Sequence, residues 1–121
     1  MLLIVFWEAF GEAMALARPL GLDAAALVEL FAETGGTNVL KNRSALVAKA
    51  LAGEETGPAT FDLDSMRNDL RTMLEEAHSR GFELPAAAST LAAFDESSDA
   101  GQGEIDAVRI PAYVAKRGGV C

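Results

Sequence analysis

The polar groups best placed for chemistry lie in the stretch 61–70, where two polar residues are enclosed by apolar positions. Asn68 and Asp69 form this pair, and Asp69 lies beside the apolar stripe of a strongly amphipathic segment. Burial there removes part of the hydration of a carboxylate, so the group needs a partner. Two interpretations stay open: a partly buried carboxylate that faces a substrate, or a surface aspartate paired with Arg67 or Arg71.

The remaining reactive groups lack the companions that their chemistry requires. His78 is the only histidine and falls near the end of a predicted helix; without a second histidine or a cysteine at ligand spacing, no metal site is predicted.

The single cysteine, Cys121, is the last residue, which leaves no intramolecular disulfide and favours a reducing, cytoplasmic compartment. No strand pattern precedes the glycines at 35–36 or 101–103, so they are expected to stop helices rather than cradle a phosphate. The sequence therefore assigns no catalytic residue and no metal ligand.

Composition bounds the architecture that must hold these groups. The 121 residues are 50% hydrophobic but only 7% aromatic, and much of the excess is alanine. Alanine favours closely packed helices over sheets rich in valine, tyrosine and threonine, so we expect an all-α fold in a single domain, 1–121. With 18 acidic and 10 basic residues the net charge is −8, which repels nucleic-acid phosphates and anionic lipids. We expect neither nucleic acid nor a membrane as a partner.

The chain opens with an uninterrupted apolar run, MLLIVFW. Glu8 and Glu12 follow too soon for a signal peptide, and the run is far shorter than the about 20 residues that span a bilayer. If the segment is helical, its apolar residues recur at steps of three and four and form one stripe. The stripe contains Leu3, Trp7, Phe10 and Met14. A helix end that is apolar all round is expected to be buried on every side, by the chain itself or by a partner.

Helix start and stop signals predict a compact bundle of about five to six helices with a long first helix. Asp23 and Asp106 are placed to cap helix starts, and Pro111 is expected to kink or split the last helix. The clearest periodicity runs from Leu63 to Ala77, at alternating steps of three and four. The expected helices cover about residues 1–17, 24–33, 38–52, 62–80, 85–96 and 107 onward.

Short motifs follow one another in a fixed order along the chain. They are Glu12–Ala17, Gly21–Asp23, Asn38–Arg43, Phe61 followed by Asn68-Asp69-Leu70, Leu84-Pro85 and Gly101–Asp106. From about Glu8 to Gly118 this order resembles the C-terminal helical domain of the β-hydroxyacid dehydrogenases, in the 6-phosphogluconate dehydrogenase superfamily. Members of that family include 3-hydroxyisobutyrate dehydrogenase and glyoxylate reductases. A weaker similarity links Ser65-Met66 and Asp69-Leu70 to the C-terminal domain of ketopantoate reductase.

The resemblance implies an enzyme of two parts: an N-terminal Rossmann domain that binds NAD or NADP, and a helical domain that closes over the substrate. The family's catalytic lysine precedes the residues that look like Met1 to Ala17, so we expect this chain to lack that lysine and the dinucleotide fingerprint. Phe61 and Asp69 match the family's substrate-side positions. Asn68 stands where the family usually places a lysine, and its amide keeps hydrogen-bonding capacity but offers no charge to an anionic group.

These observations favour an isolated substrate-side and dimerisation domain of a dehydrogenase similar to 3-hydroxyisobutyrate dehydrogenase. Alone it is expected to hold no cofactor and to be inactive; the expected partners are a second copy, bound through the first helix, and a Rossmann domain. The alternative is a non-catalytic helical module that dimerises or binds another protein. Bare apolar side chains at the first helix would each forgo about 1.5–3 kcal/mol relative to burial, which predicts self-association.

Overall fold

The chain folds into helices joined by short loops. The structure is a computed structural model that describes residues 2–34 and 36–117, so Gly35 and Cys121 lie outside it. Within these ranges no strand occurs, apart from an isolated bridge between Asp62 and Asp106. The α-helices are α1 (Leu2–Ala17), α2 (Ala24–Thr34), α3 (Gly36–Leu51), α4 (Leu63–Ser79), α5 (Pro85–Ser97) and α6 (Ile110–Arg117). Shorter helical turns are η1 (Arg18–Leu20), η2 (Ser98–Gln102) and η3 (Ala107–Arg109). The predicted all-α bundle with a long first helix is confirmed.

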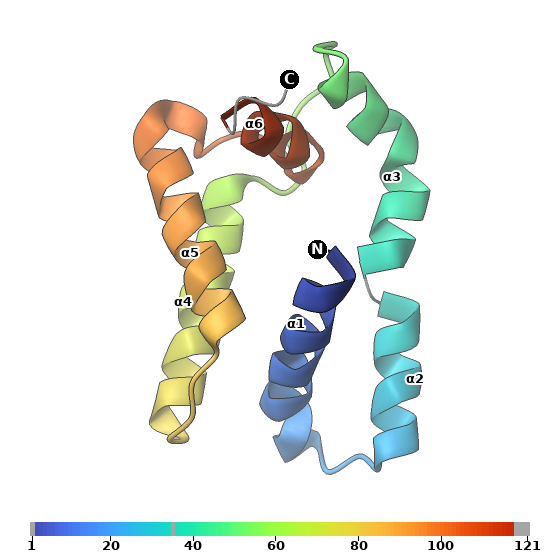
Figure 1. Ribbon diagram of the computed structural model, residues 1–121, viewed down its shortest axis with the longest axis vertical. Coiled ribbons are helices and arrows are strands. Elements are labelled where there is room, and N and C mark those ends of the chain that lie inside the picture. The colour runs from blue at the N-terminus through green and yellow to red at the C-terminus, as the bar shows by residue number, and fades with distance from the viewer. Residues whose placement is uncertain (1, 35, 118–121) are drawn as a thin grey trace.

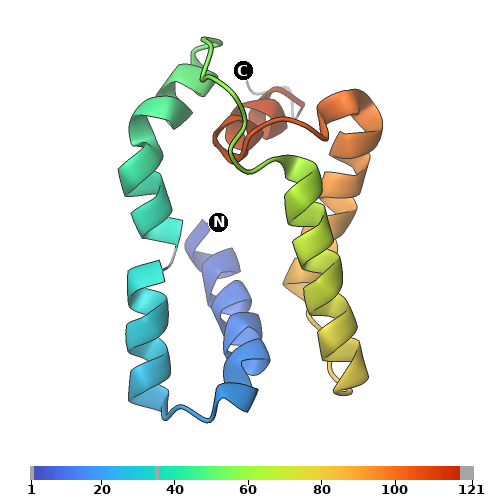
Figure 2. The ribbon, with the colours of Figure 1, turned by 180° about the vertical axis from the view of Figure 1, so that it is seen from behind.

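The helices form two side groups with α1 between them (Figures 1 and 2). α4 and α5 lie antiparallel on one side, α2 and α3 follow one another along the other side, and α6 crosses near one end. α4 and α5 share the most extensive contact, and α6 with η3 packs against α3. Contact between α1 and α2 is sparse by comparison. Packing of α4 against α5 therefore fixes the position of the polar residues on α4.

Local capping residues set the helix boundaries much as the sequence predicts. Oδ1 of Asp23 accepts a hydrogen bond from the Ala26 amide at 2.8 Å, which caps α2. Asp62 caps α4 in the same way, by accepting from the Ser65 amide at 2.8 Å. Pro111 lies in the first turn of α6, where its missing N–H costs nothing, and the last helical region divides into η3 and α6 as expected.

A short extended pairing joins the start of α4 to the segment that leads into η3. The Asp64 amide donates to the Gly103 carbonyl at 2.9 Å, and the Ala107 amide donates to the Phe61 carbonyl at 3.0 Å. The sequence predicts a loop from 97 to 103, but the chain continues there into the π-helical turn η2. The pairing and η2 together bring polar groups of η2 and of the segment before η3 close to the first turns of α4.

The buried apolar core is small relative to the surface that remains. The buried apolar side chains of the described residues are Leu27, Ala50, Leu63, Ala77, Leu84 and Val108. The accessible surface is 8186 Å², roughly 2,000 Å² more than the about 6,200 Å² expected of a globular monomer of 12.7 kDa. The chain therefore exposes more surface in total than a compact monomer of its mass.

Three side chains contradict the burial that helical periodicity predicts. Leu51 and Met73 belong to apolar stripes, yet they are 53% and 41% exposed. Glu12 falls on the polar side of the first helix by its spacing, yet it is buried. Periodicity identifies the apolar face of a helix but not the neighbour that covers it. No described helix is long and apolar enough to cross a membrane.

Candidate functional site

The predicted substrate-side residues lie at the start of α4 and in its second turn. Phe61 precedes the capping residue and is 44% exposed, and the side chains of Asn68 and Asp69 are also exposed. Among the described residues the Asp69 carboxylate has no hydrogen bond or ion pair, so the expected pairing with Arg67 or Arg71 does not occur. Of the two interpretations, the exposure of Asp69 agrees with a surface aspartate but, within the described ranges, one without an arginine partner. The three residues form an open edge that other groups must complete if it is to enclose a substrate.

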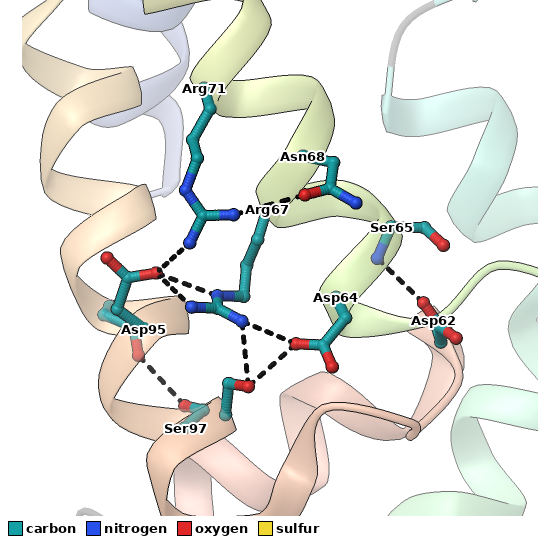
Figure 3. A network of polar contacts seen from close by, with 10 residues as sticks. Asp62, Asp64, Ser65, Arg67, Asn68, Arg71, Asp95 and Ser97 are labelled. Carbon is teal, nitrogen blue, oxygen red and sulfur yellow. Dashed lines mark hydrogen bonds and ion pairs between the residues drawn. The ribbon is translucent and has the colours of Figure 1, made fainter.

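Asn68 is oriented by a neighbour one turn further along α4 (Figure 3). Its Oδ1 accepts a hydrogen bond from Nη1 of Arg71 at 3.2 Å, and its backbone carbonyl accepts from Oγ1 of Thr72 at 3.1 Å. The two N–H donors of the Asn68 Nδ2 group have no partner in the described part of the chain. At this position the chain offers hydrogen-bond donors rather than the ammonium of a lysine.

An ion-pair network that the sequence did not reveal joins α4 to α5 and η2 (Figure 3). Arg67 contacts Oδ1 of Asp64 through Nη1 and Oδ1 of Asp95 through Nη2, both at 2.8 Å. Arg71 reaches the same Asp95 oxygen at 3.2 Å. The Ser98 hydroxyl accepts from Arg67 at 2.9 Å and donates to Asp64 at 2.8 Å. Two arginines and two aspartates cancel in charge, so the network fastens the helices together and presents no net charge to a ligand.

The network also shifts the pKa of two of its members, Asp64 and Arg67. Hydrogen bonds from Arg67 and then from Ser98 lower the pKa of Asp64, although partial burial opposes them. The hydrogen bonds to Asp64 and Asp95 raise the pKa of Arg67. Both groups therefore remain ionised at neutral pH, and neither is suited to general acid–base work there.

Gly103 packs directly against this network. A Cβ atom at this position would lie 2.1 Å from Oδ2 of Asp64, a separation that the folded chain does not allow. Gly101 adopts a φ of 90°, the left-handed region that favours glycine, and so breaks the regular helix as predicted. These glycines serve a sharp turn and a close approach to a carboxylate, which is a poor surrounding for a phosphate.

Asp106 is buried, at 5% exposure, and joins η3 to the residues before α4. Its Oδ1 accepts from the amide and hydroxyl of Thr60 at 2.8 and 3.1 Å and from the Phe61 amide at 3.1 Å. Its Oδ2 accepts from the Val108 amide at 3.0 Å and lies 3.5 Å from Nη2 of Arg43. Burial raises the pKa of this carboxyl, but the hydrogen bonds from Val108, Phe61 and Thr60 outweigh it and lower the pKa to about 2. The predicted cap of the last helical region is confirmed, and the same carboxylate holds the backbone of Phe61.

The predicted interdomain or dimer surface on α1 is exposed at one end. We call Val5, Phe6 and Trp7 the α1 apolar end; they are 51%, 45% and 62% exposed. The rings of Phe6 and Trp7 contact each other edge to face, with centroids 5.5 Å apart. The side chain of Leu3 lies outside the described part of the structure. The α1 apolar end is thus a patch of large side chains that this chain does not cover.

The other two predicted surface residues of α1 are less exposed than Trp7. Phe10 is half-buried and packs edge to face against Phe31 of α2, with centroids 5.7 Å apart, and Met14 is also half-buried. That Phe10 and Met14 belong to a dimer or interdomain surface stays a prediction, although both are less exposed than Trp7. Phe10 also fills part of the sparse contact between α1 and α2.

Glu12 is a structural residue that sequence reasoning missed. Its Oε2 accepts from the Ala86 amide at 2.7 Å, and its Oε1 accepts from the Ala87 amide at 3.1 Å. α5 begins with Pro85 after Leu84, and Leu84 makes no side-chain cap. A helix start without its own capping residue was the signal that an acceptor must come from elsewhere in the chain.

The fold and these contacts define a helical domain whose polar residues are held by caps and ion pairs. A family model described as NAD-binding of NADP-dependent 3-hydroxyisobutyrate dehydrogenase matches residues 1–113. The chain belongs to this family, which confirms the resemblance to β-hydroxyacid dehydrogenases. Comparisons with curated proteins and with solved structures give no significant match.

The family implies NAD or NADP, but the described residues do not fit a dinucleotide on their own. A dinucleotide cradle places a glycine-rich turn between a strand and the N-terminus of a helix, and residues 2–34 and 36–117 contain no strand. Gly103 lies against the Asp64 carboxylate, which would repel a pyrophosphate. In the same ranges no three histidine, cysteine, aspartate or glutamate side chains are grouped to hold a metal ion. No step of a hydride transfer is assigned to this part of the chain.

Proposed function

We propose that the chain is the substrate-side and subunit-contact domain of an NAD(P)-dependent oxidoreductase of the 3-hydroxyisobutyrate dehydrogenase type. The observation that carries this proposal is the family match over residues 1–113, combined with a described fold that has no dinucleotide cradle. NAD or NADP, held by a Rossmann domain, supplies the hydride acceptor. The helical domain supplies groups that orient the substrate against it.

The open edge of α4 carries groups that suit a small hydroxyacid. Phe61 offers an exposed ring whose backbone is held in place by Asp106. Asn68 offers two N–H donors for a carboxylate or hydroxyl oxygen, and the carboxyl group of Asp69 offers an acceptor for a hydroxyl group. An apolar ring, a pair of donors and an acceptor are the kinds of group that recognise the methyl, carboxylate and hydroxyl groups of such a substrate.

The α1 apolar end supports contact with a second copy of the chain. A standard interface buries about 800 Å² on each partner, well within the extra surface that this chain exposes. Large aromatic side chains such as Trp7 and Phe6 are the kind that anchor interfaces when they are covered. The second copy is the favoured occupant because an isologous contact pairs the same patch with itself and needs no other protein.

The proposal predicts that the purified chain neither binds NADPH nor transfers hydride to or from 3-hydroxyisobutyrate and its oxidised form. Isothermal titration with NADPH, followed by a spectrophotometric assay of NADP reduction, measures both properties. We expect no binding heat and no turnover above the buffer rate. Low-micromolar binding of NADPH, or sustained turnover by the chain alone, contradicts the proposal.

Adding a dinucleotide-binding domain separates this proposal from a non-catalytic helical module. In the presence of the Rossmann domain of a 3-hydroxyisobutyrate dehydrogenase, the proposal expects turnover that Asp69→Asn and Phe61→Ala both reduce. Asp99→Asn, an exposed aspartate on η2, is the matched control and should leave turnover unchanged. Stable self-association without any turnover in this mixture favours the non-catalytic module.

A further inference from the structure

A cavity of about 390 Å³ lies between the end of α3, the segment before η3, and α6. It is separate from the open edge of α4, because none of Phe61, Asn68 and Asp69 lines it. Its volume falls in the range of about 300–1,000 Å³ that is typical of small-molecule sites. The space is therefore large enough for a compact organic ligand.

The charge of this cavity is opposite to that of the chain. The net charge is −8, yet the cavity is lined by Arg109 and Lys116 and by no aspartate or glutamate. Two other cavities that the structure describes follow the overall charge instead, since one is lined by Glu29 and Glu33 and the other by Glu12. A local reversal of charge in an acidic protein indicates a preference for an anion.

Arg109 is held in place while part of its guanidinium stays available. Its Nη1 donates to the Glu54 carbonyl at 3.1 Å and to Oγ1 of Thr56 at 3.3 Å. The Nε and Nη2 donors have no partner among the described residues, and neither has the ammonium group of Lys116. A guanidinium fixed on one side and open on the other loses little side-chain entropy when it binds an oxyanion.

The last turn of α3 does not need the two cations as hydrogen-bond donors. The carbonyls of that last turn already accept backbone hydrogen bonds: Lys49 from Glu54 at 2.9 Å and Ala50 from Gly53 at 3.0 Å. The helix therefore ends with its own cap, in the manner of a Schellman motif. The ammonium group of Lys116 and the remaining donors of Arg109 are therefore available to a ligand.

The rest of the lining suits a ligand with an apolar body. Arg109, Ala112, Tyr113 and Lys116 recur at steps of three, one and three, so they face the cavity from one side of η3 and α6. The other lining residues are mainly aliphatic. They consist of Ala50, Leu51, Ala52, Gly53 and Ile105, with the amide of Gln102 beside them.

We propose that this cavity binds a small organic carboxylate, with its head group on Arg109 and Lys116 and its apolar body against Leu51 and Tyr113. The exposure of Leu51, which the periodicity of α3 predicts to face inward, follows from its place in the lining of this cavity. A carboxylate is favoured over a bare phosphate because most of the lining contacts an apolar body rather than further oxygens. The proposal stands apart from the dehydrogenase function and does not depend on it.

Titration of the 15N-labelled chain with benzoate, followed by amide chemical shifts, tests this site. Benzylamine is the matched probe of similar shape and opposite charge, and inorganic phosphate is the anion without an apolar body. We expect saturable benzoate shifts at Gly53, Gln102 and Tyr113, and little or no response there to the other two probes. Equal responses to benzoate and benzylamine, or phosphate binding as tight as benzoate binding, overturn the proposal.

Substitutions in α6 provide the second arm. Lys116→Met removes an exposed cation without a structural partner and should weaken benzoate binding about three- to tenfold, the loss expected for a partly exposed charge-assisted contact. Lys41→Met, an exposed lysine on α3 outside the cavity, changes the net charge equally and should leave binding unchanged. Arg109→Lys keeps the positive charge but removes the planar set of guanidinium donors, so it tests whether those donors contribute to binding. Thermal unfolding of the variant checks that its fold is intact. Equal effects of Lys116→Met and Lys41→Met contradict the site.

Discussion

At the scale of single residues, Asp106 shows how one carboxylate can organise a site from a distance. It accepts hydrogen bonds from both sides of the pairing between η3 and the residues before α4, and it fixes the backbone of Phe61. Because the carboxylate is buried among donors, its ionised form is the one that the fold stabilises. The position of the exposed Phe61 ring therefore depends on a residue that does not belong to the open edge of α4.

Asp106→Asn should lower the free energy of unfolding by about 2–3 kcal/mol at pH 7. The amide keeps one acceptor oxygen but turns N–H donors toward the amides of Phe61 or Val108, which cannot accept them. Urea denaturation followed by circular dichroism measures the change. Asp23→Asn is the matched control, because Asn caps an exposed helix start about as well as Asp.

The same residue predicts how stability depends on pH. Its pKa is lowered from 3.8 to about 2, so the folded state binds this proton less tightly than the unfolded state does. The ionised carboxylate contributes about 2 kcal/mol above pH 4, and this contribution is lost as the pH falls toward 2. Wild type should therefore lose stability faster than Asp106→Asn between pH 4 and pH 2. Parallel stability curves in that interval would show that another group carries the acid sensitivity.

Sequence reasoning finds residues whose role is local and misses those whose role is long-range. Asp23 and Asp106 were predicted as caps because a cap acts within three residues of its own position. The network of Arg67 with Asp95 spans 28 positions, and periodicity says nothing about which side chain of α5 faces α4. For the same reason the sequence placed Asp69 beside a buried stripe, whereas its turn of the helix faces solvent.

At the scale of elements, Glu12 determines how α1 and α5 meet. Its carboxylate replaces the capping residue that α5 lacks, across a separation of 74 residues. The pKa of Glu8 is raised. The main cause is its side-chain hydrogen bond with Glu12, and loss of hydration and the charge repulsion from Glu12 contribute less. The start of α5 is thus held by α1, and loss of this contact should loosen both helices together.

Glu12→Ala should lower the free energy of unfolding by about 2 kcal/mol, because two partly buried amides at the start of α5 lose their acceptor. Hydrogen exchange at Ala86 and Ala87 should accelerate in the same variant. Glu12→Gln retains acceptor capacity and should cost less. Glu75→Ala, an exposed glutamate on α4, is the control and should stay within about 0.5 kcal/mol of wild type. An unchanged exchange rate at both amides in Glu12→Ala would contradict the capping role.

Element boundaries were largely predictable, while element environments were not. Prolines, glycines and capping aspartates act on the backbone next to them, so α2, α4, α5 and the division before α6 start close to where the sequence places them. The π-helical turn at η2 was missed because Gly101 breaks the helix several residues later than the polar run suggests. The exposure of Leu51 and Met73 depends on which other helices cover α3 and α4. The order of apolar residues along one helix does not contain that information.

At the scale of the whole molecule, the excess of accessible surface and the α1 apolar end lead to the same expectation. The sequence predicts that the opening helix needs cover, and the folded chain leaves Val5, Phe6 and Trp7 about half exposed. Each copy carries a net charge of −8, so two copies repel one another at low ionic strength. Association should therefore strengthen when salt screens this repulsion.

Sedimentation equilibrium of the purified chain at micromolar concentration tests the central claim that this domain functions as part of an assembly. The account predicts a mass at least twice the 12.7 kDa of one chain. It also predicts a shift toward that single-chain mass in the double variant Phe6→Ser, Trp7→Ser. Phe10 is left intact because it packs against Phe31, and Val114→Ser, a 40% exposed apolar residue on α6, serves as the control. A stable monomer of the wild-type chain at these concentrations, or equal masses for wild type and the double variant, would contradict the account.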